Sequence, residues 1–211
     1  MSIEGTRREY QYDSLTKESL KGCPIDQFSY WMDQALNSQL PDPTAMSLAT
    51  VDPVGKSWQR TVLLKGVNKQ GFIFYTNFGS RKALEMEGNP NVSLLFPWFS
   101  LDRQVIVGGK VEKISENESL IYFRKRPRAS QLGAWASKQS SKLFSRTALE
   151  DEYSCIEKKY TNMEVPCPDF WGGYRVVPAE IEFWQGGELR LHDRFQYLLG
   201  EKGWIISRLS P

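Results

Sequence analysis

The clearest hydrophobic period in the chain begins at Pro24. Apolar residues then recur at steps of three and four, at Phe28, Trp31, Met32, Ala35 and Leu36. This period places their side chains on one face of a helix, and Pro24 suits a first helical turn. The sequence Pro41-Asp42-Pro43 marks the point before which the helix must end. The pattern therefore predicts an amphipathic helix between Pro24 and Pro41, with its apolar stripe packed in the core.

After this helix the pattern changes to short β-rich runs separated by turn sequences. Predicted strands span residues 45–51, 58–65, 72–76, 92–97, 103–114, 174–184, 190–198 and 204–208. Predicted helices span residues 80–88, with Ser80 as the cap, and residues 116–124, 130–137 and 148–160. Gly108-Gly109 lies inside the run 103–114 and predicts a bulge that bends the sheet. Many short strands with helices among them favour an α+β fold, an antiparallel β-barrel surrounded by helices, over a doubly wound parallel sheet.

Residues 1–23 are polar and weakly periodic, and we expect a mobile arm there that orders over a ligand or partner. Residues 24–211 are then expected to form a single domain, which is large enough to bury a hydrophobic core without disulfide bonds or structural metal ions. The cysteines Cys23, Cys155 and Cys167 have neither metal-ligand spacing nor an even number, which indicates a reducing compartment and predicts no metal site. With no apolar signal core at the start and no apolar run long enough to cross a bilayer, we expect a cytoplasmic protein.

The charges are nearly balanced along this chain. It has 27 basic and 25 acidic residues, for a net charge of +2. No overall field therefore draws it to nucleic acid or to a membrane, and any anion binding must be local. Seven Trp, nine Tyr and eleven Phe suit a flat aromatic ligand or a large interface, although most are expected in the core.

No glycine-rich nucleotide fingerprint follows a predicted strand, so side chains must hold any phosphate. Four basic clusters supply candidates: Arg60 with Lys65, Arg81-Lys82, the run 124–128, and Arg190 with Arg194. Arg81-Lys82 follows a glycine-containing turn at a predicted helix start, where free N–H groups favour a phosphate, and ordinary capping by Ser80 is the alternative. Regular alternation places Arg60 and Lys65 on opposite faces of their strand.

Tyr122, Arg126 and Ser130 step at intervals of four. They share one side if a helical path continues through Pro127. A solvated basic surface is the alternative for this run.

The single histidine of the chain lies in Arg190-Leu191-His192-Asp193-Arg194. Alternation along a strand sends the two arginines and the imidazole to one face, which predicts an anion-binding and proton-active site. An edge strand with solvated charges is the alternative. A Ser–His–Asp triad with Asp193 is conceivable, but no serine occupies a nucleophile elbow.

Several motifs occur together in a specific order and spacing. They are Arg60-Thr-Val-Leu-Leu-Lys65, Phe74-Tyr75-Thr76-Asn77, Gly79-Ser80-Arg81-Lys82, Ser93-Leu-Leu-Phe96-Pro97-Trp98, Arg103-Gln104-Val105, Ser137-Lys-Gln139-Ser140, Phe170-Trp171-Gly172-Gly173 and Phe183-Trp-Gln-Gly-Gly-Glu188 followed by Arg190-Leu-His-Asp-Arg194. Together they resemble the pyridoxine (pyridoxamine) 5′-phosphate oxidase family over nearly the whole chain, from Arg7 to Pro211.

The resemblance implies a split β-barrel that binds flavin mononucleotide (FMN) and a homodimer with its active sites at the interface. It implies oxidation of pyridoxine or pyridoxamine 5′-phosphate to pyridoxal 5′-phosphate, with O2 as acceptor and H2O2 as product. The implied FMN contacts are Arg60, Thr61, Val62, Leu63, Leu64, Lys65, Tyr75, Thr76, Arg81, Lys82, Gln104, Gln139, Ser140, Trp184 and Arg194. The implied substrate contacts are Arg7, Arg8, Glu9, Tyr10, Lys65, Tyr122, Arg126, Ser130, Arg190, Leu191 and His192, with Arg190 and His192 in catalysis.

Two other functions stay open at this point. One is a non-catalytic protein that binds FMN or pyridoxal phosphate, and the other is a split-barrel flavin reductase with a different electron donor. Nucleic-acid binding is the weakest alternative, because the net charge is nearly zero and the sequence contains no recognisable nucleic-acid-binding motif.

Overall fold

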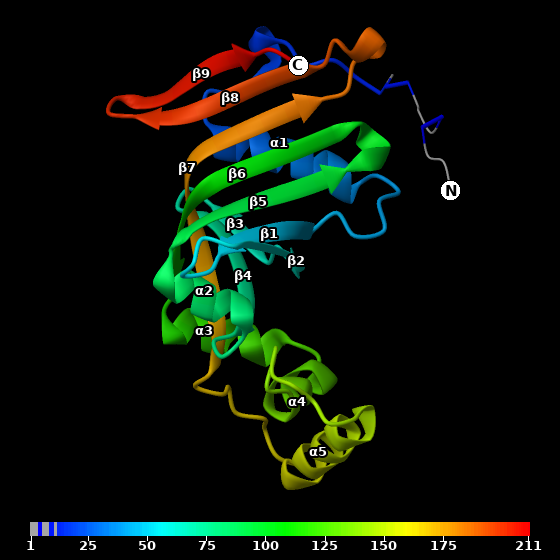
Figure 1. Cartoon of the computed structure of the whole chain (residues 1–211), viewed down its shortest axis with the longest axis vertical. Coiled ribbons are helices and arrows are strands. Elements are labelled where there is room, and N and C mark those ends of the chain that lie inside the picture. Colours follow the sequence, from blue (N-terminus) through cyan, green and yellow to red (C-terminus); the bar gives the residue numbers. More distant parts are fainter. Residues whose placement is uncertain (1–3, 6–8, 11) are drawn as a thin grey trace.

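The computed structural model describes residues 4–5, 9–10 and 12–211, so Arg7 and Arg8 of the expected arm lie outside the described residues. Within the described part, a nine-stranded antiparallel sheet has the order β2-β1-β5-β6-β7-β4-β3, and β8 and β9 extend it from β7 (Figure 1). The strands are β1 (Ala45–Val51), β2 (Ser57–Leu63), β3 (Gly66–Asn68), β4 (Gly71–Asn77), β5 (Asn91–Trp98), β6 (Arg103–Lys113), β7 (Trp171–Gln185), β8 (Asp193–Gly200) and β9 (Gly203–Leu209). The sheet curls into a half-barrel, which confirms the expected fold class.

The long strand β7 joins the two ends of the molecule. Its first half pairs with β4 and its second half with β8, while β6 runs along both halves. The register between β6 and β7 shifts at Gly108/Gly109, which confirms the predicted bulge. A Cβ on Gly109 would lie 2.2 Å from the carbonyl oxygen of Val177, so only glycine fits this close approach. Since a strand rises about 3.3 Å per residue, Trp171 and Trp184 are separated by up to about 40 Å along β7.

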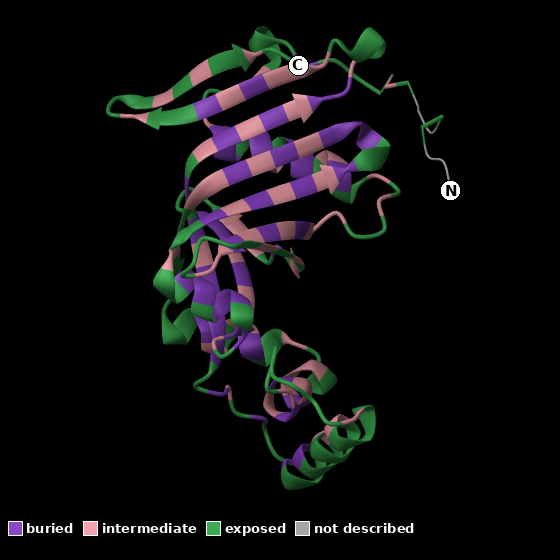
Figure 2. Cartoon of the chain, in the orientation of Figure 1, coloured by how far each residue is buried: buried purple, intermediate pink, exposed green. Residues whose placement is uncertain are grey.

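The main core lies between the sheet and α1 (Pro24–Leu36), which confirms the predicted amphipathic helix, but Leu36 of the expected apolar stripe is exposed. The Phe28 ring is fully buried, and its centroid lies 4.8 Å from those of Phe72 and of Phe96. On the strands, buried and half-buried residues alternate, so the opposite face of the sheet is only partly covered (Figure 2). The sheet therefore has one face in the core and one face open to a further partner.

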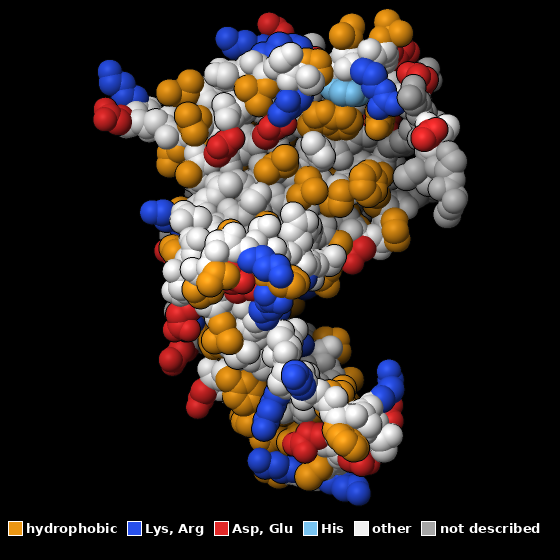
Figure 3. Space-filling model, viewed as in Figure 1, with side chains coloured by type: hydrophobic (Ala, Val, Ile, Leu, Met, Phe, Trp, Pro, Cys, Tyr) orange, Lys and Arg blue, Asp and Glu red, His pale blue; other side chains and the backbone are white. Residues whose placement is uncertain are grey.

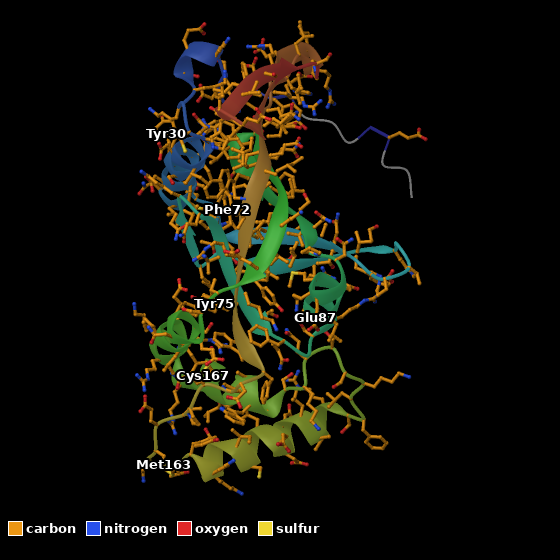
Figure 4. All side chains as sticks on the ribbon, turned by 90° about the vertical axis from the view of Figure 1, so that its left-hand side faces the viewer. Tyr30, Phe72, Tyr75, Glu87, Met163 and Cys167 are labelled. Atoms are coloured by element: carbon orange, nitrogen blue, oxygen red, sulfur yellow. The ribbon has the colours of Figure 1, made fainter. Side chains whose placement is uncertain are left out.

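The remaining helices are α2 (Arg81–Gly88), α3 (Glu116–Lys125), α4 (Arg128–Ala136) and α5 (Arg146–Lys159). A second, smaller core forms where α3, α4 and α5 meet the first residue of β7, around Phe123, Leu132, Ile156 and Trp171. In the side view, Tyr75 lies between the main core near Phe72 and this helical end near Cys167 (Figure 4). Among the described helices, none is long and apolar enough to cross a membrane.

The predicted strand 190–198 is wrong at its start. Residues Glu188–Arg190 form a 3-10 turn, and β8 begins only at Asp193. Leu189 and Arg190 have left-handed φ values of 54° and 65°, so the backbone turns sharply before the strand. The alternation that was expected to place Arg190, His192 and Arg194 on one strand face therefore does not exist. The short strand β3, with 3-10 turns at Lys17–Ser19 and Phe99–Leu101, was not predicted.

Candidate active site

A cavity of about 960 Å³ opens between the edge of the sheet and the helices α2, α3 and α4. Its lining includes most of the residues expected to contact FMN and the substrate phosphate. They come from β2, β4, α2, α3 and α4 and from the loops after β2, α3 and α4. Those residues are Arg60, Thr61, Val62, Leu63, Lys65, Tyr75, Thr76, Arg81, Lys82, Tyr122, Arg126, Ser130, Gln139 and Ser140. Lys and Arg side chains gather at this waist of the molecule, between the sheet and the lower helices (Figure 3).

The expected ligand-binding residues reach the cavity because strands end and helices break next to it. Regular alternation was expected to place Arg60 and Lys65 on opposite faces of one strand, but β2 ends at Leu63, so Lys65 does not belong to that strand. Both residues line the cavity. Leu64 turns into the core instead, where it is 6% exposed.

Tyr122, Arg126 and Ser130 all line the cavity, but not through the continuous helical path that was expected to place them on one side. They do not belong to one helix. The chain leaves α3 after Lys125 and enters α4 at Arg128, with Pro127 at the N-cap position. The proline breaks the helix, and the second helix restarts in an orientation that keeps all three side chains on the cavity.

Lys82 is the central cation at one end of the cavity. Its side chain is buried, and its ammonium donates to Thr76 Oγ1 at 3.1 Å, to Ser80 Oγ at 3.2 Å and to Gln139 Oε1 at 3.3 Å. Burial and then repulsion by Arg60 lower the pKa of Lys82 to about 8, while Glu85 opposes the shift. An anion placed here would restore the charged form, because opposite charge favours it.

Ser80 occupies the N-cap position of α2, but its side chain makes no capping hydrogen bond within the described residues. Its hydroxyl oxygen accepts from Lys82 instead. The alternative of ordinary capping by Ser80 is therefore wrong, and the helix start is free to meet an anion.

Glu85 is a site residue that sequence reasoning missed. It lies one turn after Arg81 on α2 and accepts from Arg81 Nε at 2.7 Å and from Arg60 Nη2 at 2.9 Å. The spacing of four residues on a predicted helix was a usable signal for the first pair. The second pair joins a strand to a helix, which only the tertiary structure reveals.

A stack of aromatic rings forms one wall of the cavity. Tyr75 and Tyr122 stack with centroids 3.9 Å apart and an interplanar angle of 15°, and Trp171 lies 5.4 Å from Tyr75 at 9°. Burial raises the pKa of both tyrosines, so their phenols stay protonated and act as neutral donors.

Arg126 holds the other end of the cavity. Its guanidinium lies 4.6 Å from the centroid of Trp171, and burial lowers its pKa while the nearby Tyr122 opposes that shift. Its buried Nη1 has no hydrogen-bond partner among the described residues. A buried N–H of a cation without an acceptor is costly, and a bound phosphate oxygen would satisfy it.

The expected residues of the C-terminal segment lie elsewhere, at the far end of β7 and β8. Gln104, Trp184 and Arg194 are cross-strand neighbours in one row of β6, β7 and β8, on the partly covered sheet face. The rings of Tyr10 and His192 lie 5.6 Å and 4.7 Å from that of Trp184, and the Arg190 guanidinium lies 5.7 Å from the Tyr10 ring.

Local hydrogen bonds define the chemistry of this second cluster. His192 Nδ1 accepts from the backbone N–H of Gly187 at 3.1 Å, so its Nε2 carries the proton in the neutral ring. Asp193 accepts from Leu15 N and from Arg208 instead of from His192, so the structure contains no Ser–His–Asp triad through this pair. Arg194 donates to both carboxylate oxygens of Glu182, and that hydrogen bonding raises its pKa.

Comparison with known proteins shows which family the chain resembles. The family model described as pyridoxamine 5′-phosphate oxidase matches residues 32–160, and the model described as pyridoxine 5′-phosphate oxidase C-terminal dimerisation region matches residues 171–211. The pyridoxine/pyridoxamine 5′-phosphate oxidase of Vibrio vulnificus (strain YJ016) is 52% identical over 211 residues, all of both chains. The oxidase of Shewanella sediminis (strain HAW-EB3) is 55% identical over 210 residues, 99% of each chain.

Two solved structures share the fold. PhzG from Burkholderia lata 383, solved in complex with tetrahydrophenazine-1-carboxylic acid, matches with a TM-score of 0.89 and 27% identity over 94% of this chain and 98% of that one. An FMN-binding protein from Nostoc punctiforme PCC 73102, related to pyridoxamine 5′-phosphate oxidase, matches with a TM-score of 0.71 and 17% identity over 92% and 99%. The chain therefore belongs to the pyridoxine/pyridoxamine 5′-phosphate oxidase family.

Proposed function

We propose that this protein is an FMN-dependent oxidase that converts pyridoxine 5′-phosphate or pyridoxamine 5′-phosphate to pyridoxal 5′-phosphate. The observation that carries the proposal is a single cavity with a cationic end at Lys82, another at Arg126, and an aromatic wall between them. Two phosphorylated ligands with flat rings need such an arrangement, because each dianion requires its own charge-assisted donors.

The Lys82 end suits the FMN phosphate. Arg60, Arg81 and Lys82 supply charge, and Thr76, Gln139 and Ser140 supply further polar groups. The start of α2 adds unpaired backbone N–H groups, which favour an anion at this position. We also assign Thr61, Val62, Leu63 and Leu64 to FMN contact, with Leu64 able to contribute only through its backbone.

The Arg126 end suits the substrate phosphate. Lys65, Tyr122 and Ser130 line the same cavity as the buried guanidinium of Arg126. Holding the phosphate there uses binding energy remote from the reacting carbon to orient the substrate ring.

The homodimer completes each site in this proposal. Gln104, Trp184 and Arg194 would reach the FMN of a second copy from the partly covered sheet face, and Arg190, Leu191 and His192 would reach its substrate. The family region for dimerisation, residues 171–211, includes β7 and β8 and so carries most of these residues. Glu9 and Tyr10 would close over the substrate, together with Arg7 and Arg8.

Bound FMN would supply the redox chemistry, taking up a hydride equivalent from C4′ of the substrate and passing the electrons to O2 to give H2O2; with pyridoxamine phosphate, water would then hydrolyse the resulting imine and release ammonia. The protein supplies orientation and electrostatics. Arg190 would stabilise negative charge on the substrate oxygens, and His192 would donate from Nε2, because Gly187 occupies its Nδ1. The three free thiols are consistent with our assignment to the cytoplasm.

An absorption spectrum of the purified protein, before and after FMN is added, tests this function first. We expect a flavin spectrum that bleaches on anaerobic addition of pyridoxamine phosphate, and oxygen consumption when air is admitted. Bleaching by a nicotinamide alone would favour a flavin reductase. A protein that takes up FMN but never bleaches would be a binding protein, and a protein that stays colourless with FMN would contradict the proposal.

A further inference from the structure

A single buried carboxylate lies behind the Lys82 end of the cavity. Glu85 is 4% exposed. One of its oxygens, Oε2, accepts from Arg60 Nη2 at 2.9 Å and from the Thr50 hydroxyl, and the other, Oε1, accepts from Arg81 Nε at 2.7 Å. Burial alone would raise the pKa of Glu85, but the hydrogen bonds from Thr50, Arg81 and Arg60 outweigh it and hold the pKa below its usual range. The group is therefore an anion that two guanidinium groups share.

The indole ring of Trp58 stacks on the flat face of the Arg81 guanidinium. The Arg81 Cζ lies 3.3 Å from the centroid of the Trp58 ring, a close cation–π stack. Arg81 also approaches Asp52 Oδ2 at 4.0 Å from the turn between β1 and β2. The hydrogen bond to Glu85 thus holds the edge of the Arg81 guanidinium, and stacking on Trp58 fixes the orientation of its plane.

Fixing these arginines matters for an anion site. A free arginine loses rotamer freedom when it binds, whereas a guanidinium already held in one plane loses less for each hydrogen bond formed. Arg60 is further tied by Nη1 to the backbone oxygen of Leu48 at 3.1 Å. Both arginines nevertheless line the cavity, so their remaining N–H groups are available to a ligand there.

We propose that Glu85, assisted by Trp58, is a positioning residue that orients Arg60 and Arg81 for the phosphate of the flavin. The inference rests on the proposed function, because the anion it concerns is the FMN phosphate. Glu85 touches no ligand itself in this assignment. It acts by holding two guanidinium groups, one from a strand and one from a helix, in fixed planes.

The difference between a carboxylate and an amide provides the test. A carboxylate accepts at both oxygens, whereas the amide of glutamine accepts at one atom and donates at the other. In Glu85→Gln the side chain keeps its length, but its NH2 group must face one of the two arginine donors. One guanidinium is therefore released from its plane.

The experiment compares binding of FMN with binding of riboflavin, which lacks the phosphate, by quenching of flavin fluorescence. We expect Glu85→Gln to weaken FMN binding about tenfold or more, the size of one charge-assisted hydrogen bond, and to leave riboflavin binding within about twofold. Trp58→Leu is expected to weaken FMN binding about threefold to tenfold and to leave riboflavin binding within about twofold. Glu87→Gln is the matched control, because it removes the same charge from an exposed position of the same helix.

The pH dependence provides a second readout, which reports the charge of Glu85. Glu85 favours the charged form of Lys82, and Arg60 disfavours it. Thr76 and Gln139, which also contact the ammonium, are neutral, and Lys65 and Arg81 are further cations of the cavity. Without the carboxylate, the loss of FMN affinity on raising the pH should begin at a lower pH than in the parent protein.

Equal losses for FMN and riboflavin in Glu85→Gln would overturn the proposal, since they indicate a distorted cavity. Unchanged or tighter FMN binding would also overturn it. If Glu85→Gln does not fold, a Trp58→Leu protein that binds FMN as the parent does would contradict the role. A parent protein that binds no FMN would instead refute the proposed function, and the inference would fail with it.

Discussion

The cavity and the far end of β7 and β8 are both rich in arginine, but their charges are balanced differently. At the far end Arg194 pairs with Glu182, and Arg208 pairs with Asp193. At the cavity the two arginines Arg60 and Arg81 share Glu85.

Two further cations of the cavity add to that excess. Lys82 forms no ion pair within the described residues, and Arg126 has a buried N–H without a partner there. Arg194 and Arg208 are thus each neutralised by a carboxylate, while the cavity has an excess of positive charge that an anion would offset.

This difference indicates separate tasks for two segments that the chain places far apart. In the proposed function the cavity binds the phosphates, and the β7–β8 end presents Trp184, His192 and Arg190 to a second copy. If the proposal is correct, neither region forms an active site alone within one subunit.

Mixing two inactive variants is the strongest test of that division. We expect Lys82→Met and Arg190→Ala each to have almost no activity. After co-expression, half of the dimers pair the two variants and one site in each pair is intact, so about a quarter of the parent activity should return. The measurement is oxygen consumption with pyridoxamine phosphate.

The control for this experiment mixes Lys82→Met with Arg126→Ala, two changes in the same cavity. Every cavity in that mixture carries one of the two defects, so the activity should equal the mean of the two variants expressed alone, with no gain from co-expression. Recovery in the control, or none in the first mixture, would show that the two regions do not combine across subunits.

Arg190→Ala alone should reduce turnover about a hundredfold, because a group that stabilises developing charge acts mainly in the transition state. Its effect on FMN affinity should stay within about threefold, since the assigned contact is to the substrate. Steady-state kinetics and flavin titration measure the two effects. Equal losses in both would contradict the assignment.

Arg126→Ala should raise the KM for pyridoxine phosphate about tenfold or more and change kcat by less than about threefold. The reason is that Arg126 holds a phosphate remote from the reacting carbon. Arg124→Ala is the matched control, because Arg124 forms an exposed ion pair with Glu164 and does not line the cavity. A collapsed kcat with an unchanged KM would refute the role of Arg126.

The pH dependence of FMN binding should show the smallest effect. The ammonium of Lys82 has a pKa of about 8 in the free protein. A bound dianion raises that pKa, so FMN binding takes up a proton above pH 8 and the affinity falls as the pH rises, by up to about tenfold per unit. The phosphate contributes no slope there, because its second pKa is about 6. Titrations from about pH 7 to about pH 9.5 measure the slope. A parent protein whose slope equals that of Lys82→Met would contradict the prediction.

The positions of the strands and helices were largely predictable from the sequence, because each depends on local period and turn chemistry. The helix from Pro24, the bulge at Gly108-Gly109 and the helix after Ser80 are examples, and the structure confirms them. The strand at 190–198 was the clearest failure. The sequence alternates there, but left-handed φ values at Leu189 and Arg190 replace the strand with a turn.

The motifs by themselves also determined the family, and they predicted the kind of ligand, because the order and spacing of basic and aromatic residues can be read directly from the sequence. Only the tertiary structure decided which cations meet. Arg60 and Lys65 share a cavity because β2 ends between them, and Tyr122 and Ser130 share it because Pro127 redirects the chain. Glu85 joins Arg60 to Arg81 across a strand and a helix. Contacts between segments distant in the sequence depend on how the elements pack, and no local period along the chain encodes that packing.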